Sequence, residues 1–249
     1  MSKVNPMPLA HHRAIAAVDQ TYWWHRFRFE VVHTILARSS APQSVVDVGC
    51  GPGGFLEMLA RRHPTWSLLG VDSSPTAIQV ARERGIPATL MEIGEDGRLP
   101  LTPDWITLLD VLEHVSDPEP LLRALVRSCR PGTELVMTVP AHPFLFSKWD
   151  VGLGHVQRYT RRSLEMLLSR CGFRVLRVSH LLAFAVPLVF LQRKVLRTRS
   201  VGACEFPSLP AWVADAFLGL ARFESRLSSL CSLPCGTSLL CHFAPTFRS

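Results

Sequence analysis

The stretch with the most specific chemistry is residues 45–54, where an apolar run passes into a backbone almost without side chains. Its glycines, Gly49, Gly51 and Gly53, can adopt backbone angles that are closed to other residues and let a ligand approach the main chain. A helix that begins near Phe55 would offer free backbone N–H groups beside them. The pattern predicts a cradle for a nucleotide cofactor.

The glycine spacing alone leaves the kind of nucleotide open, because Gly49, Gly51 and Gly54 also fit the G-x-G-x-x-G pattern of dinucleotide sites. The flanking acids favour a ligand that carries a cation. Asp47 lies two residues before the first glycine, where its carboxylate can reach an ammonium group, whereas a dinucleotide site avoids negative charge near its pyrophosphate. Asp72 ends the next apolar run and can accept both hydroxyls of a ribose, which NAD would use equally well.

A third polar cluster lies within residues 104–115, which read as a buried strand running into a polar turn. Asp110, Glu113 and His114 are crowded at the carboxyl end of that strand. The four stretches 47–53, 71–72, 99–100 and 110–115 resemble, in order and spacing, the motifs of class I S-adenosylmethionine-dependent methyltransferases. This resemblance covers residues 44–179.

The resemblance implies S-adenosylmethionine as the cofactor and a Rossmann-like α/β fold with seven strands, helices on both faces and a helical insertion before the last strand. It assigns the glycine loop to the methionine part of the cofactor and Asp72 to the ribose. Glu95, followed by Asp96, lies where the family often has an acid beside the adenine, and which acid reaches the adenine stays open. The cofactor-binding residues that it implies are Asp47, Gly49, Cys50, Gly51, Gly53, Asp72, Ser73, Glu95, Asp110 and Val111.

Five further stretches resemble a subgroup of bacterial methyltransferases and extend the likeness over nearly the whole chain. They are residues 22–28, 139–143, 147–150, 154–160 and 233–239. This likeness says little about the methyl acceptor, because members are commonly named only by their cofactor.

The chain must supply elements that bring these residues together, and its apolar runs predict alternating strands and helices. The predicted strands are residues 44–48, 67–71, 87–91, 105–109, 133–139, 173–179 and 238–243. The predicted helices lie within residues 9–38, 55–62, 75–84 and 118–129, and Thr160 can cap another. This alternation predicts a parallel sheet with ligands at the carboxyl ends of its strands, and the resemblance implies an antiparallel hairpin at the sheet's edge.

We expect four regions: an N-terminal helical cap (1–40), a cofactor-binding core (41–180), a helical insertion (181–235) and a last strand with its tail (236–249). At 249 residues the chain suits one core with an insertion better than two domains.

The insertion offers two amphiphilic segments. Residues 181–191 are apolar almost all round and precede the cations Arg193, Lys194, Arg197 and Arg199. That order fits a helix in a membrane interface, and a buried helix or a dimer contact fits its length equally well. Residues 212–230 are amphipathic, as expected of a lid over an apolar substrate.

Composition narrows the location and the partners. No apolar window is long enough to span a membrane, and the opening residues lack the apolar core of a secretory signal, so we expect a cytoplasmic protein, with peripheral contact at the inner face of the membrane as a further option. Seven cysteines without C-x-x-C spacing favour reduced thiols over disulfides or zinc. The net charge of +7 suits phosphorylated substrates, anionic lipids or nucleic acid, and the lack of a long basic run ranks nucleic acid below the others.

Methyl transfer to a hydroxyl requires a group that removes the proton, and histidine suits that task near neutral pH. The candidates are His114, His142 and His155. His155 is preferred because Asp150 and Arg158 lie in the same loop after the fifth predicted strand. His142 and Asp150 are the other predicted catalytic residues. The alternative is that His155 and Arg158 pin the loop or bind a substrate phosphate.

The predicted substrate-binding residues are Arg158, Tyr159 and Arg26. Trp23, Trp24 and Phe27 either pack an N-terminal helix or help it close over the cofactor, with Arg26 or Arg28 reaching a carboxylate or phosphate. No metal site is expected, since the adjacent Glu113 and His114 make a poor ligand pair.

The sequence therefore predicts a methyltransferase that acts on a hydroxyl of a small or lipid-linked molecule. Two other functions stay open: an NAD(P)-dependent reductase of the Rossmann type, and a membrane-associated protein that binds S-adenosylmethionine without turnover. The oligomeric state is not predicted.

Overall fold

The computed structural model describes residues 9–38, 41, 43–94, 97–191, 193, 209–228 and 233–247. Within these ranges the elements are α1 (Leu9–Val18), α2 (Trp23–Leu36), β1 (Ser44–Val48), α3 (Gly54–Arg62), β2 (Ser67–Asp72), α4 (Pro75–Glu83), β3 (Ala88–Leu90), β4 (Trp105–Leu109), α5 (Glu119–Ser128), β5 (Glu134–Pro140), α6 (Lys148–Gly152), α7 (Arg161–Arg170), β6 (Phe173–Leu181), α8 (Ala185–Phe190), α9 (Ala211–Ser228) and β7 (Ser238–Pro245). Two short 3₁₀ helices, η1 (Leu112–His114) and η2 (Pro143–Leu145), follow β4 and β5.

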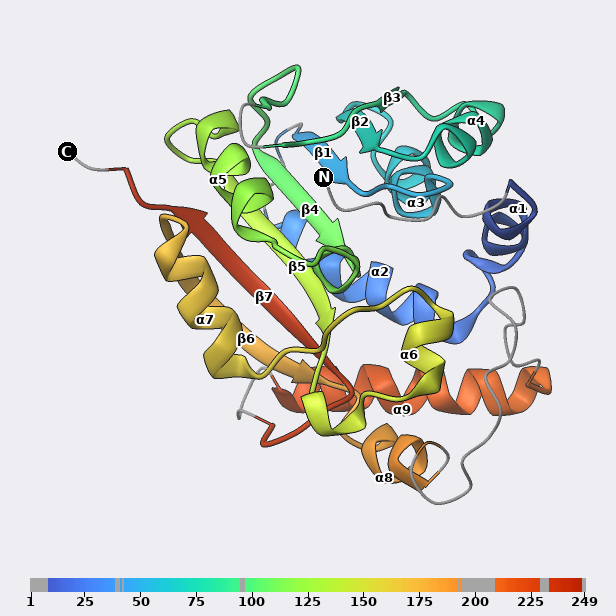
Figure 1. The fold of residues 1–249 in the computed structure, drawn as a ribbon. Helices are drawn as coiled ribbons and strands as arrows, with labels where there is room; N and C mark the ends of the chain where they lie inside the picture. The colour runs from blue at the N-terminus through green and yellow to red at the C-terminus, as the bar shows by residue number, and fades with distance from the viewer. Residues whose placement is uncertain are drawn as a thin grey trace.

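One seven-stranded sheet organises the molecule, with strand order β3-β2-β1-β4-β5-β7-β6 (Figure 1). Strands β1 to β5 pair in parallel, and β7 runs antiparallel to both β5 and β6. The predicted α/β fold with an antiparallel hairpin at the edge is confirmed. Because the first strands are parallel, their carboxyl ends and the loops that follow meet at one edge of the sheet.

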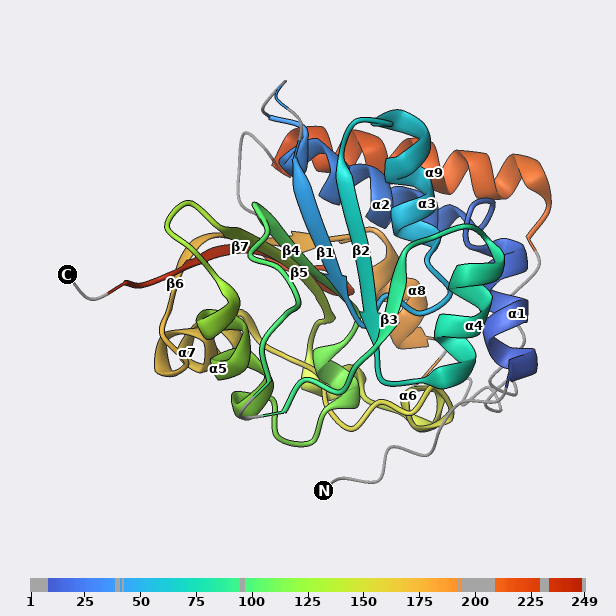
Figure 2. The same ribbon diagram turned by 90° about the horizontal axis from the view of Figure 1, so that it is seen from above.

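Helices cover both faces of this sheet, with α2, α3 and α9 on one side and α5 and α7 on the other (Figure 2). Each face has its own core, which includes Phe27 and Leu56 on the first side and Leu122 and Leu168 on the second. All five residues of β4 are buried. A strand covered on both faces reads as a continuous apolar run, which explains why β4 was recognisable from the sequence.

The predicted strands and helices begin and end within two residues of the observed ones, and the region predicted to be helical at the N-terminus divides into α1 and α2. Ser74 caps α4 by accepting a hydrogen bond from the Ala77 backbone, and Pro75 occupies its first turn. Thr160 caps α7 as predicted, accepting a hydrogen bond from the Ser163 backbone N–H.

The prediction of one helix over residues 181–191 is wrong in its bounds, because α8 spans only Ala185–Phe190. Leu181 is the last residue of β6, and Leu182 has a φ of 63°, so the chain turns before α8 begins. Lys194, Arg197 and Arg199 lie outside the described residues. Among the helices that the structure describes, none is long and apolar enough to cross a membrane.

The end of β6 and the start of β7 pack so closely that only glycine fits at position 236. A Cβ atom there would lie 2.3 Å from the carbonyl oxygen of Leu181. We expect Gly236→Ala to lower the free energy of unfolding by roughly 1–3 kcal/mol, because backbone atoms must move to relieve the overlap. Urea unfolding followed by circular dichroism measures this change.

Gly219 provides the matched control. It lies inside α9, and a Cβ atom added there meets nothing within 4 Å. Gly219→Ala should stabilise the protein by about 0.5–1 kcal/mol, since alanine favours a helix interior. Equal effects of the two substitutions would contradict the close packing at Gly236.

Candidate functional site

The glycine loop between β1 and α3 has the backbone conformation that its sequence predicts. Gly49, Gly51 and Gly53 have φ values of 71°, 54° and 81°, in the left-handed region that favours glycine. A Cβ atom at Gly49 would lie 2.6 Å from a methyl carbon of Val111, so the loop after β1 touches the loop after β4. Gly51 faces open space. The main chain is thus bare on the side where a ligand would approach.

Two aspartates flank this loop in different environments. Asp47 is buried and accepts a 2.6 Å hydrogen bond from the Thr107 hydroxyl. Burial raises the pKa of Asp47 to about 7, although Thr107 and Arg28 oppose the shift. Asp72 accepts hydrogen bonds from the backbone N–H groups of Gly51 (2.9 Å) and Ser74 (2.8 Å). Asp72 therefore shapes the glycine loop, and each carboxylate oxygen keeps a lone pair for another donor.

Asp110 and Arg28 form an ion pair beside the loop. Asp110 has a φ of 57° and accepts a 2.8 Å hydrogen bond from the Thr138 hydroxyl. Burial opposes ionisation, but Arg28 and Thr138 lower the pKa of Asp110 below its ordinary value. The Nε atom of Arg28 is buried and has no hydrogen-bond partner among the described residues. That donor is available to an acceptor brought by a ligand.

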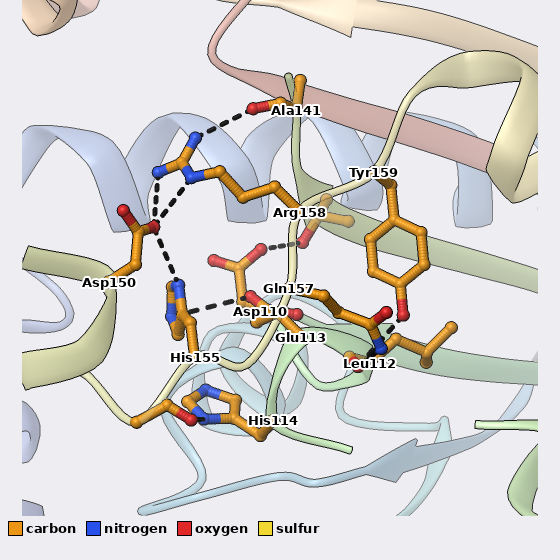
Figure 3. Close-up of polar contacts among 12 residues, drawn as sticks. Asp110, Leu112, Glu113, His114, Ala141, Asp150, His155, Gln157, Arg158 and Tyr159 are labelled. Atoms are coloured by element: carbon orange, nitrogen blue, oxygen red, sulfur yellow. Dashed lines mark hydrogen bonds and ion pairs between the residues drawn. The ribbon is translucent and has the colours of Figure 1, made fainter. Parts of the chain in front are cut away.

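A second polar cluster centres on Asp150, which lies in α6 after β5. His155 lies between the carboxylates of Asp150 and Glu113 (Figure 3), with Nδ1 3.3 Å from Asp150 Oδ1 and Nε2 4.0 Å from Glu113 Oε1. Asp150 also contacts Arg158 at 2.7 Å and Arg193 at 2.8 Å. Burial alone would raise the pKa of Asp150, but His155 and the two guanidinium groups lower it well below its usual range. Asp150 is therefore ionised at neutral pH.

Glu113 is the most isolated acid of the site. Its side chain is fully buried, and neither carboxylate oxygen has a hydrogen-bond partner among the described residues. Burial, reinforced by Asp110, raises the pKa of Glu113 well above its ordinary value. His114 beside it places Nδ1 3.2 Å from the Gly154 carbonyl oxygen, and burial lowers its pKa to about 4.

Glu113, His114 and His155 have potential ligand atoms within 4.8 Å of one another, a spacing that a divalent cation could bridge. The expectation that these groups serve hydrogen bonding rather than metal binding stays a prediction.

One cavity of about 800 Å³ joins the glycine loop to the Asp150 cluster. Of the predicted site residues, those that line it are Asp47, Gly49, Cys50, Gly51, Asp110, His155 and Arg158. Those that do not line it are Gly53, Asp72, Ser73, Val111, His142, Asp150, Tyr159 and Arg26. Glu95 lies outside the described residues.

Several residues outside the lining have other partners. His142 stacks on His180 with ring centroids 5.5 Å apart, and Tyr159 donates a 3.1 Å hydrogen bond to the Leu112 carbonyl. Arg26 lies 3.8 Å from Asp215 on α9. The structure thus places Arg28, rather than Arg26, in the cavity.

Arg193 is a site residue that the sequence reading missed. In the sequence it is one of several cations that follow an apolar segment, yet its guanidinium contacts buried Asp150 and lines the cavity. No local pattern pairs residues 43 positions apart. The sequence points only to its partner, because Asp150 belongs to the stretch 147–150 that resembles the bacterial subgroup.

Comparison with known proteins identifies the family of the core. A family model described as a methyltransferase domain matches residues 21–178. That range contains the glycine loop, Asp72 at the end of β2, Asp110 after β4, and the loop with His155.

Curated relatives match parts of the chain. It is 33% identical over 200 residues to an uncharacterized 37.1 kDa protein in transposon TN4556 of Streptomyces fradiae, covering 77% of this chain and 54% of that protein. It is 36% identical over 111 residues to a trans-aconitate 2-methyltransferase of Variovorax paradoxus, covering 43% and 42%. It is 28% identical over 180 residues to a ubiquinone biosynthesis O-methyltransferase of Pseudomonas fluorescens, covering 65% and 75%. The chain spans about half or less of the first two relatives.

Solved structures share the fold at low sequence identity. A putative methyltransferase in complex with a Haloferax volcanii methyltransferase activator superposes with a TM-score of 0.60 at 18% identity, covering 96% of this chain and 98% of that one. The plantazolicin methyltransferase BpumL in complex with S-adenosylhomocysteine gives 0.56 at 17% identity, covering 96% and 94%.

The Asp150 cluster yields a stability prediction. Asp150→Asn removes the negative charge that neutralises buried Arg158, so it should lower the free energy of unfolding at pH 7 by roughly 3 kcal/mol. Because the folded pKa of Asp150 lies below the unfolded one, its contribution is complete above about pH 4 and is lost as the pH falls further. Urea unfolding between pH 7 and pH 3 should therefore show the gap between wild type and variant narrowing in acid.

Glu165→Gln is the control, because Glu165 pairs with Arg161 at an exposed position. It should change stability by less than about 0.5 kcal/mol. Wild-type stability of Asp150→Asn at pH 7 would contradict the stabilising role of the cluster.

Proposed function

Because the chain belongs to the class I S-adenosylmethionine-dependent methyltransferases, we propose that it methylates a hydroxyl oxygen of a small molecule and that His155 receives the hydroxyl proton. One observation carries this proposal: the glycine loop and His155 line the same cavity. Donor and acceptor can therefore be held together, which is the main requirement of an in-line displacement.

The residues at the glycine loop fit S-adenosylmethionine, which when bound supplies a methyl group on a positively charged sulfur. Asp47 is positioned for the ammonium group of its methionine part, and the unpartnered Nε of Arg28 for its carboxylate. Asp72, at the end of β2, keeps acceptor capacity for the ribose hydroxyls. The bare backbone at Gly49 and Gly51 leaves room for close approach.

His155 is suited to accept a proton because its ring is held in one orientation. Its Nδ1 faces the ionised Asp150 carboxylate, which favours a proton on that nitrogen and leaves Nε2 as an acceptor. When Nε2 takes the proton, the imidazolium cation remains next to the negative charge of Asp150. Arg158 and Arg193 fix the carboxylate from its other sides. The same division of roles makes histidine and aspartate effective in other enzymes.

An oxygen acceptor is favoured because a hydroxyl must lose its proton, and the cavity contains a residue equipped for that step. The relative from Pseudomonas fluorescens is by name an O-methyltransferase, which supports the same choice. A protein that binds the cofactor without turnover is the alternative function, and methyl transfer to any hydroxylated acceptor separates the two functions.

Replacement of His155 tests the catalytic assignment. His155→Gln should lower kcat for a hydroxylated acceptor by about 10²–10⁴-fold, the usual contribution of general-base catalysis. The dissociation constant of S-adenosylhomocysteine should stay unchanged. His142→Gln, a histidine outside the cavity, should keep wild-type kcat. If both variants turn over at the same rate as the wild type, His155 is not the base.

Titration calorimetry tests the cofactor site through Asp47. At pH 7 this carboxyl group is about half protonated, since its pKa is about 7. An ammonium group beside it lowers that pKa, so S-adenosylmethionine should displace about half a proton per site at pH 7. Measurements in buffers of different ionisation enthalpy give the number of protons released.

Asp47→Asn should bind more weakly and release no proton. S-adenosylhomocysteine should behave as S-adenosylmethionine does, and NADH should not bind. Binding of NADH alone would overturn the proposed function.

A further inference from the structure

The cavity has two chemically different walls. The wall near the glycine loop and His155 is polar. A second wall is apolar and comes from the N-terminal helix and the insertion, with Trp23 and Trp24 on α2, Phe184 and Leu188 at α8, and Phe217 on α9. A family match that ends at residue 178 does not include the two insertion helices. The insertion therefore adds to the cavity a surface that lies outside the matched methyltransferase domain.

Aromatic rings give the apolar wall a defined shape. The ring of Trp23 packs edge-on against Phe217 with centroids 5.4 Å apart, and Phe184 lies 6.5 Å from Trp23 and 6.0 Å from Phe217. Such tilted and edge-on pairs are the favoured geometries for aromatic side chains. Three chain segments distant in sequence thus form one continuous apolar surface facing the cavity.

The apolar wall continues to the outside of the protein. Leu188, Leu191 and Leu209 line the cavity and are nonetheless 53%, 45% and 37% exposed. The six residues of α8 include no charged side chain. The cavity therefore opens at α8 through a mouth of leucine side chains. Such an exposed apolar surface favours contact with an apolar group of a ligand.

We infer that the methyl acceptor carries an apolar chain, which lies along the wall of Trp23, Phe184 and Phe217 and leaves the cavity at Leu188. The inference rests on the proposed function for the position of the hydroxyl head at His155. A cavity of about 800 Å³ has room for two ligands of moderate size. The cofactor needs the end at the glycine loop, and the apolar end remains for the acceptor.

Arg193 links the apolar wall, along which the acceptor's alkyl chain would lie, to His155. It follows α8 in sequence, and its guanidinium lies 2.8 Å from Asp150 Oδ2, while the other oxygen of Asp150 faces His155. The position of α8 is thereby fixed relative to the His155 ring. An acceptor bound by its chain would present its head at a constant distance from the base.

A series of alkyl 4-hydroxybenzoates, from methyl to octyl, tests the inference, because each member has the same phenolic hydroxyl and differs only in chain length. Trp23, Trp24 and Trp149 line the cavity, so tryptophan fluorescence reports binding. We expect the dissociation constant to fall about fourfold for each added methylene until the chain reaches the mouth. A dissociation constant independent of chain length would overturn the inference.

Two matched substitutions test where the alkyl chain of the acceptor lies. Leu188→Asp at the mouth should weaken binding of the octyl ester at least tenfold and leave the methyl ester unaffected. Phe223→Asp changes a similarly exposed apolar residue on α9 that does not line the cavity, and it should bind both esters as the wild type does. Equal losses in the two variants would also overturn the inference.

Calorimetric binding of S-adenosylhomocysteine separates this inference from the proposed function. Wild type and both variants should bind it equally, because the substitutions lie away from the glycine loop. Normal cofactor binding without chain-length dependence rejects only the apolar chain. Loss of cofactor binding in the wild type rejects the proposed function itself.

Discussion

The carboxylate of Asp150 is the interaction on which the candidate site depends. One buried charge orients His155, neutralises Arg158 and holds Arg193 at the end of the insertion. Burying a charge is costly unless it is paired and hydrogen-bonded, so these partners stabilise each other only while Asp150 remains ionised. Its backbone partner Ser147, which donates to the same carboxylate, anchors α6 at the same point. Loss of this charge would therefore loosen three segments together.

The sheet brings the polar residues of the candidate site close to one another. The loops after β1 and β4 meet where Gly49 packs on Val111, and Arg28 on α2 pairs with Asp110 across the same junction. Backbone groups and charges thus converge from elements fixed by the core on both faces of the sheet. The polar residues of the cavity are therefore held by the core of the sheet, whereas the apolar residues come from the helices α2, α8 and α9.

The parts of the site that the sequence predicted are those determined by neighbouring residues. The glycine loop, the acids at strand ends and the cap at Thr160 follow from local rules, and the structure has all of them. The contacts of Arg193 with Asp150, the choice of Arg28 over Arg26 and the isolation of Glu113 depend on segments far apart in the chain. No spacing within one segment encodes them. The predicted helix over residues 181–191 began too early, because an apolar run does not reveal where a strand stops and a turn begins.

The position of β7 has a consequence for how the protein is made. This strand comes from the last residues of the described chain, yet it lies between β5 and β6 in the sheet. During synthesis, β6 lacks its partner and β5 lacks one of its two partners until residues 238–245 have been made. Until then both strands expose unpaired backbone groups, a state that invites pairing with other chains. Completion of the sheet therefore waits for β7, and a chain without residues 238–245 would expose strand edges on both β5 and β6.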